Sequence, residues 1–234
     1  MWRSPDPRRE YDVVIIGGGG HGLGAAYFLA KEHGITNVAV LEKGWLGGGN
    51  TGRNTMTVRS NFLREDSVPF HEMSLDLYHQ LSRDLNYNLM VSQRGMITFI
   101  QSSAANRVAL QMANTMHIYG AEYRMLTLDE VKQKIPIFDP SPDMRLPVRG
   151  GVYQPRASMV RHDAVAWGFA RAADARGVDI IQNCEVTGIQ QEGGAVTGVE
   201  TNRGVIKAKK IGMAVAGHGS VVASMVGQRL PIIT

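Results

Sequence analysis

The hydrophobic pattern near the N-terminus predicts a strand, a helix and a second strand in quick succession. Residues 11–16 form a mainly apolar run rich in β-branched residues, which stops at glycine as a buried parallel strand does. Apolar residues at helical spacing follow from Leu23 to His33, and Gly34 ends that pattern. Residues 37–43 are a second apolar run, so about 30 residues have the order of a βαβ unit.

The rest of the chain continues as a mixture of helical and strand-like segments. Thr127 and Glu130 have the spacing of a capping box, which predicts a short helix that ends before Pro136. Further helices are predicted over residues 66–85, 103–119 and 162–177. Strands are predicted over residues 95–100, 178–189, 195–202 and 204–217. A glycine-rich loop is expected at 44–55 and an irregular, proline-rich connection at 136–155, so the fold class is α/β.

Three glycines in the first strand-to-helix connection form the pattern G-x-G-x-x-G, at Gly17, Gly19 and Gly22. Glycine there permits a tight turn, close approach of the backbone to a pyrophosphate, and close packing of helix on strand. Glu42 ends the second strand, where a carboxylate can accept hydrogen bonds from an adenosine ribose. The pattern therefore predicts dinucleotide binding rather than an empty glycine-rich turn. A glutamate at this point disfavours NADP, while NAD and FAD both remain open.

Composition and charge exclude several other classes. The chain is 44% hydrophobic and 20% charged, which is ordinary for a globular protein. Its net charge of +4 is spread out, without the clustered basic face of a nucleic-acid-binding protein. A single cysteine excludes an internal disulfide framework and a cysteine-rich metal site. Residues 1–10 are expected to be a flexible arm, not a secretory signal, and no apolar run is long enough to span a membrane, which favours the cytoplasm.

Several separated motifs carry a resemblance to a known family. They are GGGGHG (17–22), VLEKGWLGGGNTGRNT (40–55), RSNFL (59–63), SQRG (92–95), the segment 153–188 and GHGSV (217–221). Together they resemble the amine-oxidising FAD enzymes of the D-amino-acid oxidase superfamily. Within that superfamily they are most similar to the β subunits of heterotetrameric sarcosine oxidases.

The resemblance implies a Rossmann-type FAD-binding domain with an inserted, mixed α+β substrate domain. We expect the FAD-binding domain over residues 11–85 and 156–234, and part of the substrate domain over 86–155. Members of the family continue past the length of this chain, so we expect its C-terminal part to be missing. The oxygen-activating lysine and several substrate contacts would lie there, and no catalytic residue is assigned within these 234 residues.

The resemblance also implies two flavins, a noncovalent FAD and an FMN attached covalently to His162. From the residues alone, a histidine before a helix is usually a cap or a surface residue, although a neutral imidazole nitrogen can attack the flavin 8α-methyl carbon. The expected FAD contacts are Gly17, Gly19, Gly20, His21, Gly22, Glu42, Lys43, Asn50, Thr51, Arg53, Asn54, Thr55, Val186, Ala216 and Gly217.

The implied reaction is oxidative demethylation of sarcosine (N-methylglycine). FAD takes a hydride equivalent, electrons pass to FMN and then to oxygen, and the imine passes to tetrahydrofolate on the α subunit. The implied partners are the α, γ and δ subunits of a heterotetramer, with no nucleic acid or membrane. Two alternatives stay open: a related dehydrogenase subunit that acts on glycine, proline or dimethylglycine and passes electrons to a carrier, or a noncatalytic flavin-binding fragment.

Overall fold

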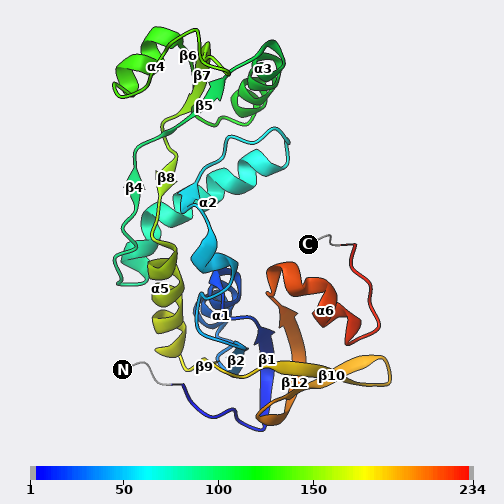
Figure 1. Cartoon of the computed structure of the whole chain (residues 1–234). Helices are drawn as coiled ribbons and strands as arrows, with labels where there is room; N and C mark the ends of the chain where they lie inside the picture. The colour runs from blue at the N-terminus through cyan, green and yellow to red at the C-terminus, as the bar shows by residue number, and fades with distance from the viewer. Residues whose placement is uncertain (1–3, 232–234) are drawn as a thin grey trace. The chain divides into compact units, whose positions relative to one another are not determined.

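The computed structural model describes residues 4–231, which form two compact units. The first unit takes the residues up to Thr55, Leu85–Leu89 and the residues from His162 onward. The second unit takes Met56–Asp84 and Met90–Arg161. Figure 1 shows the course of the chain through both units, with the first unit built around the strands labelled β1, β2, β9, β10 and β12.

The first unit is built on a six-stranded sheet with the strand order β10-β11-β12-β1-β2-β9. Strands β12, β1, β2 and β9 run parallel, while β10, β11 and β12 form an antiparallel meander. The bounds are β1 Glu10–Ile16, β2 Val38–Leu41, β9 Asp179–Ile181, β10 Val186–Glu192, β11 Ala195–Thr201 and β12 Gly204–Met213. Strand β2 is buried along its whole length, which explains its unbroken apolar sequence.

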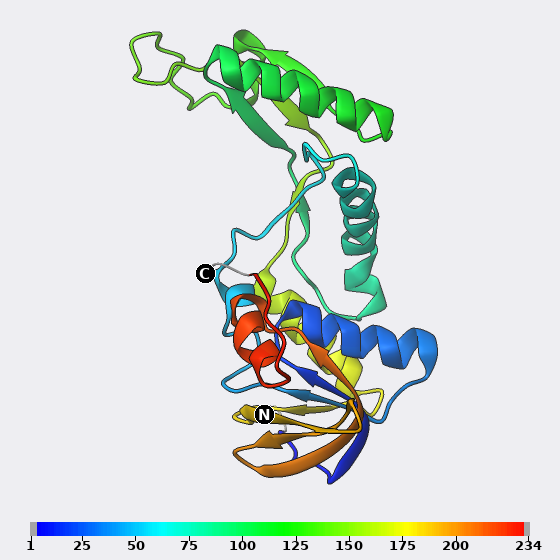
Figure 2. The same ribbon diagram turned by 90° about the vertical axis from the view of Figure 1, so that its right-hand side faces the viewer.

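Helices α1 (Gly20–His33) and α5 (His162–Asp174) lie side by side on one face of this sheet (Figures 1 and 2). Gly24 of α1 faces the ring of Phe169 in α5, so the two helices approach closely at this point. Helix α1 ends at Gly34, whose φ of 65° is the left-handed conformation that glycine adopts most easily.

On the opposite face of the sheet, side chains of β1 and of the meander form a buried cluster that includes Val222 of the short helix α6 (Gly219–Ser224). Val14 and Ile16 of β1 share a buried cluster with Val199 of β11 and Ile206 of β12. Because side chains alternate along a strand, Val13 and Ile15 point to the helical face instead. Both faces of β1 are thus buried.

The second unit contains two three-stranded sheets and three helices. The larger sheet has the order β5-β7-β6 and packs against α3, while the smaller has the order β3-β8-β4. The bounds are α2 Ser67–Asp84, α3 Ser103–Ile118, α4 Leu128–Lys134, β3 Thr57–Val58, β4 Ser92–Gln93, β5 Met96–Ile100, β6 Arg124–Thr127, β7 Gly150–Gln154 and β8 Ser158–Met159.

The division of the chain differs from the sequence-based prediction in the placement of α2. The prediction groups residues 66–85 with the nucleotide-binding domain, but the structure places α2 in the second unit. The physical reason is that Val68 of α2 is fully buried in one cluster with Ile100, Met116 and Val152, which all belong to the second unit.

Three predicted segments also require correction. The expected strand over 178–189 is interrupted by a bend at 182–185, which divides it into β9 and β10. The expected strand over 204–217 ends at Met213, and Ala216–His218 form a 3-10 turn, η2. The proline-rich connection ends earlier than expected, because residues 150–154 form β7 in the centre of a sheet.

The segment expected to be a flexible arm makes specific contacts where the structure describes it; residues 1–3 lie outside the described part. The Ser4 hydroxyl accepts a hydrogen bond of 3.0 Å from the Gln182 amide. Arg8 donates to Asp179 across 2.7 Å, which links the arm to β9. Among the helices of residues 4–231, none combines the length and apolar character required to cross a bilayer.

Candidate cofactor-binding site

The candidate site lies at the carboxyl edge of the parallel strands in the first unit. The chain order changes direction at β1, since β2 lies on one side of it and β12 on the other. In open α/β sheets, ligands bind in the crevice outside such a switch point. The glycine loop that leaves β1 therefore emerges where the topology alone predicts a nucleotide.

Two glycines of this loop have no room for a side chain. A Cβ on Gly22 would overlap the carbonyl oxygen of Gly17, which is backbone and has no free rotamer. A Cβ on Gly17 would overlap the carbonyl oxygen of Ala214, and Gly17 also has a φ of 110°. Residues 17–20 therefore run as main chain without side chains, which is the condition for close approach of a diphosphate.

The N-terminus of α1 lies at the same end of the sheet, directly after the glycine loop. Its N-cap is Gly19, which provides no side-chain cap, and no acidic residue stands in the first turn. A helix N-terminus carries unpaired N–H groups and about half a positive charge, so it attracts a diphosphate. The Thr51 hydroxyl accepts a hydrogen bond of 2.9 Å from the Gly20 amide, which connects the second glycine loop to this helix end.

Glu42 stands at the end of β2, beside the glycine loop. One carboxylate oxygen accepts from the Gly18 amide at 2.8 Å and the other accepts from the Gly44 amide at 2.9 Å. Each oxygen of a carboxylate can accept more than one hydrogen bond, so capacity remains for the hydroxyls of a ribose. The two backbone contacts fix the orientation of the carboxylate before any ligand arrives.

The second glycine loop carries most of the remaining predicted contacts. Asn50 and Arg53 lie on the 3-10 turn η1 (Asn50–Arg53), and the Asn54 amide donates to the carbonyl of Thr51 at 2.7 Å. Arg53, Asn54 and Thr55 are exposed, and Asn50 and His21 are exposed as well. These side chains stand at the surface of the first unit, within reach of a ligand that enters from solvent.

Predicted contacts from the C-terminal part of the chain lie on the same unit. Val186 is buried at the start of β10, directly after the bend that follows β9. Ala216 and Gly217 lie just past the end of β12, directly after Val215, whose side chain lies beside Gly17. Ala216 has a φ of 48°, a left-handed conformation that costs a residue with a Cβ about 1–3 kcal/mol. Strain of this kind concentrates where the backbone serves a ligand.

His162 is the first residue of α5. Its Nδ1 atom is buried and has no hydrogen-bond partner among the described residues. A buried polar atom without a partner is costly, and it indicates a ligand or partner that would complete its environment. This environment fits a histidine that carries a further group.

The structure adds several residues that the sequence analysis does not single out. The Nε2 atom of His218 lies 3.5 Å from the Nζ atom of Lys43, a predicted FAD contact, and the quoted GHGSV motif is the signal that could have identified His218. Gly47 donates to the carbonyl of Gly18 at 3.0 Å, and Gln182 accepts from the Leu46 amide at 2.9 Å. Nothing in the local sequence distinguishes Gln182, because its partner lies 136 residues away.

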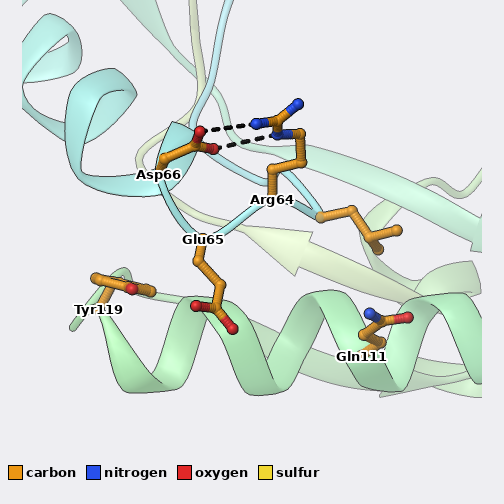
Figure 3. A pocket seen from close by; sticks show the side chains of 6 residues that line it. Arg64, Glu65, Asp66, Gln111 and Tyr119 are labelled. Atoms are coloured by element: carbon orange, nitrogen blue, oxygen red, sulfur yellow. Dashed lines mark hydrogen bonds and ion pairs between the residues drawn. The ribbon is translucent and has the colours of Figure 1, made fainter.

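A surface hollow of about 510 Å³ in the second unit offers no comparable chemistry. Figure 3 shows Arg64 paired with Asp66 at its rim, with Glu65 directed toward α3, which carries Gln111 and is followed by Tyr119. The guanidinium is already neutralised by its neighbour, and this hollow lacks the bare main chain of the glycine loop. The crevice of the first unit remains the candidate site.

A parallel sheet with a glycine loop, an uncapped helix N-terminus and an acid at its switch point defines a dinucleotide-binding domain. A family model described as "FAD dependent oxidoreductase" matches residues 12–234, nearly the whole chain. The chain therefore belongs to the FAD-dependent oxidoreductase family, which confirms the family resemblance and the Rossmann-type fold that the sequence predicts.

Two relatives are identical to this chain at about half of the aligned positions. The sarcosine oxidase subunit beta of Rhizobium meliloti (strain 1021) is 53% identical over 231 residues, which cover 99% of this chain and 55% of that protein. The sarcosine oxidase subunit beta of an Arthrobacter species is 51% identical over 232 residues, covering 99% and 57%. The chain thus spans little more than half the length of these relatives.

A solved structure shows the same fold. L-proline dehydrogenase from P. horikoshii superposes with a TM-score of 0.87 at 25% sequence identity. The superposition covers 94% of this chain and 57% of the other. The described part of this chain therefore shares the fold of that dehydrogenase.

Proposed function

We propose that this chain holds FAD noncovalently in the crevice at the end of β1 and takes part in the oxidation of sarcosine. The observation that carries the proposal is the junction of β1 and α1, where the glycine loop has main chain without side chains next to a helix whose N-cap, Gly19, provides no side-chain cap. The similarity to two sarcosine oxidase β subunits supports the substrate.

Different residues at this end of the sheet bind different parts of the cofactor. The amides at the start of α1 bind the diphosphate, with Thr51 keeping the second loop in place beside them. The fixed carboxylate of Glu42 accepts from the adenosine ribose, and the backbone at Val186 borders the adenine. Lys43 and His218 add basic groups at the same edge of the sheet. When bound, FAD accepts the hydride removed from a C–H bond next to the amine nitrogen, which leaves an imine.

We further propose that His162 carries a covalent FMN, which relays electrons toward oxygen. The support is the buried, unpartnered Nδ1 of this residue within the described structure, together with the nucleophilicity of neutral imidazole. The second unit then forms part of the substrate domain. The complete protein works in the cytoplasm with α, γ and δ subunits, and tetrahydrofolate on the α subunit receives the imine carbon. The subunit names of the relatives support an assembly of several chains.

The test is the flavin content and activity of the protein purified with its co-expressed partners. We expect acid precipitation to release FAD and to leave a second flavin bound to the protein. The variant His162→Ala should lose the retained flavin and keep the extractable FAD. The matched control is His33→Ala at the exposed end of α1, which should keep both flavins.

Turnover with a substrate panel decides the amine. We expect sarcosine to be oxidised with the highest kcat/KM among sarcosine, glycine, proline and dimethylglycine, with hydrogen peroxide formed from oxygen. A preference for proline with a dye acceptor instead of oxygen would favour the second candidate, a dehydrogenase subunit, which the structural likeness to L-proline dehydrogenase supports. Retained flavin in His162→Ala would contradict the attachment site.

A further inference from the structure

The bend between β9 and β10 is hydrogen-bonded to the backbone of Glu42 and of the second glycine loop, whose residues 44–51 are called the cofactor loop below. The Glu42 amide donates to the carbonyl of Ile181 at 2.9 Å, and the Cys184 amide donates to the carbonyl of Glu42 at 2.9 Å. The Asn183 amide donates to the carbonyl of Gly44 at 3.0 Å. This bend thus continues the pairing of β2 with β9 beyond the end of the sheet.

One side chain of the bend reaches further along the loop. The side-chain oxygen of Gln182 accepts a hydrogen bond of 2.9 Å from the Leu46 amide. Leu46 is buried, and its side chain packs 3.1 Å from the position that a Cβ on Gly18 would take. The next residue, Gly47, donates to the carbonyl of Gly18 at 3.0 Å. The position of Leu46 is therefore transmitted directly to the first glycine loop.

The backbone of Gln182 is itself held from the side away from the loop. Its amide donates to the Ser4 hydroxyl at 3.0 Å, and Arg203 donates to its carbonyl at 2.9 Å. Arg203 also donates to the carbonyl of Asn183 at 3.1 Å and lies 3.6 Å from Asp6. The N-terminal segment and the β11–β12 turn thus fix the backbone of Gln182, and its side chain accepts from the Leu46 amide.

We propose that Gln182 is a positioning residue for the cofactor loop at residues 44–51. It sets the second glycine loop, and through Leu46 and Gly47 the first one, in the geometry that accepts FAD. This proposal rests on the proposed function, since the loop is taken to bind FAD. The physical reason is that the amide of a buried residue must keep a hydrogen-bond partner, so loss of the acceptor shifts the loop toward another geometry.

The test compares FAD affinity in variants of the purified, flavin-free chain. Gln182→Met keeps the length of the side chain and removes the acceptor, so we expect the Kd for FAD to rise about tenfold. Gln182→Glu keeps an acceptor oxygen and should bind within about threefold of the original chain. The matched control, Gln190→Met on the β10–β11 hairpin, removes a hydrogen bond to Glu200 far from the loop and should leave the Kd unchanged.

Two further measurements separate positioning from general stability. A purely structural role would lower Tm equally with and without FAD and leave the Kd unaltered, whereas positioning predicts a smaller rise in Tm on addition of FAD. If Gln182→Met does not fold, Arg203→Gln releases the same bend and should raise the Kd about threefold. A Kd within twofold of the original for the folded variant overturns the inference. Absence of FAD binding by the original chain contradicts the proposed function itself.

Discussion

At the scale of single residues, the phenol of Tyr11 in β1 connects this strand to the N-terminal segment and to β9. It donates a hydrogen bond of 2.9 Å to Asp179 in β9 and accepts one of 2.9 Å from the Arg8 amide. Arg8 also donates to the same carboxylate and lies over the Tyr11 ring. The ring is fully buried at the start of β1, so the hydrogen bond from its hydroxyl to Asp179 is shielded from water.

This arrangement predicts a pH-dependent contribution of Tyr11 to stability. Burial, with the neighbouring Asp179 carboxylate, raises the pKa of Tyr11 above its ordinary value. The contribution is therefore complete below the ordinary pKa of about 10 and is lost as the pH rises through the higher value of the folded state. Tyr11→Phe should lower Tm by about 2–4 °C at pH 8, because it removes the hydrogen bond to Asp179.

The measurement is Tm against pH for both proteins between about pH 8 and pH 11, a range that brackets the ordinary tyrosine pKa. We expect the difference in Tm to shrink above pH 10, since deprotonation removes from the original chain the hydrogen bond to Asp179 that the variant lacks at every pH. Tyr119→Phe, at an exposed position of the second unit, serves as the control. A Tm difference that stays constant over this range would contradict the role of the phenol.

Single residues of the site differ in how well the sequence predicts them. Gly17, Gly22 and Glu42 are predictable because a local strand, loop and helix give each a mechanical reason. Gln182 and the amide of Gly44 are not, because their roles come from contacts between segments that only the folded sheet brings together. The FAD contacts predicted from the family resemblance lie on the first unit, and their contact with the cofactor stays a prediction.

At the scale of elements, helix α4 begins with the capping box that the sequence predicts. The Glu130 amide donates to the Thr127 hydroxyl at 3.3 Å, and the Glu130 carboxylate accepts from the Thr127 amide at 2.7 Å. This backbone hydrogen bond lowers the pKa of Glu130. A helix of 7 residues is too short to be stable by propagation alone, so its cap matters.

The capping box predicts a modest and specific loss of stability. Thr127→Ala should destabilise the protein by about 1 kcal/mol, which corresponds to a fall in Tm of about 2–4 °C. Thr127→Ser keeps the hydroxyl and should restore most of that loss. Thermal unfolding followed by circular dichroism measures both variants. Equal losses for alanine and serine would show that the hydroxyl contributes nothing.

The elements that the sequence mispredicts have a common physical cause. Strand β7 follows a proline-rich segment and begins with Gly150 and Gly151, yet it is the central strand because β5 and β6 pair with it on both sides. The segment 182–185 interrupts the predicted strand because its backbone bonds to the loop that follows β2 instead of to a strand. In both cases tertiary pairing overrides the local pattern.

The whole molecule combines two units, and the sequence predicts their nature better than their boundaries. The βαβ pattern and the separated motifs predict a member of a flavoenzyme family, and the family model confirms this over residues 12–234. The boundary near α2 differs from the predicted one. The apolar stripe of this helix shows that one of its faces is buried, but not which unit it packs against. The covalent FMN and the partner subunits stay predictions.

The central claim is that FAD binds to bare main chain at the junction of β1 and α1, and titration of the purified, flavin-free chain with FAD tests it directly. We expect one FAD per chain, and no saturable binding by Gly22→Ala, whose Cβ would overlap the carbonyl of Gly17. Gly24→Ala, two residues further along the same helix, meets only the Phe169 ring at 3.6 Å and should bind FAD as the original chain does. Undiminished binding by folded Gly22→Ala, or no binding by the original chain, would contradict the account.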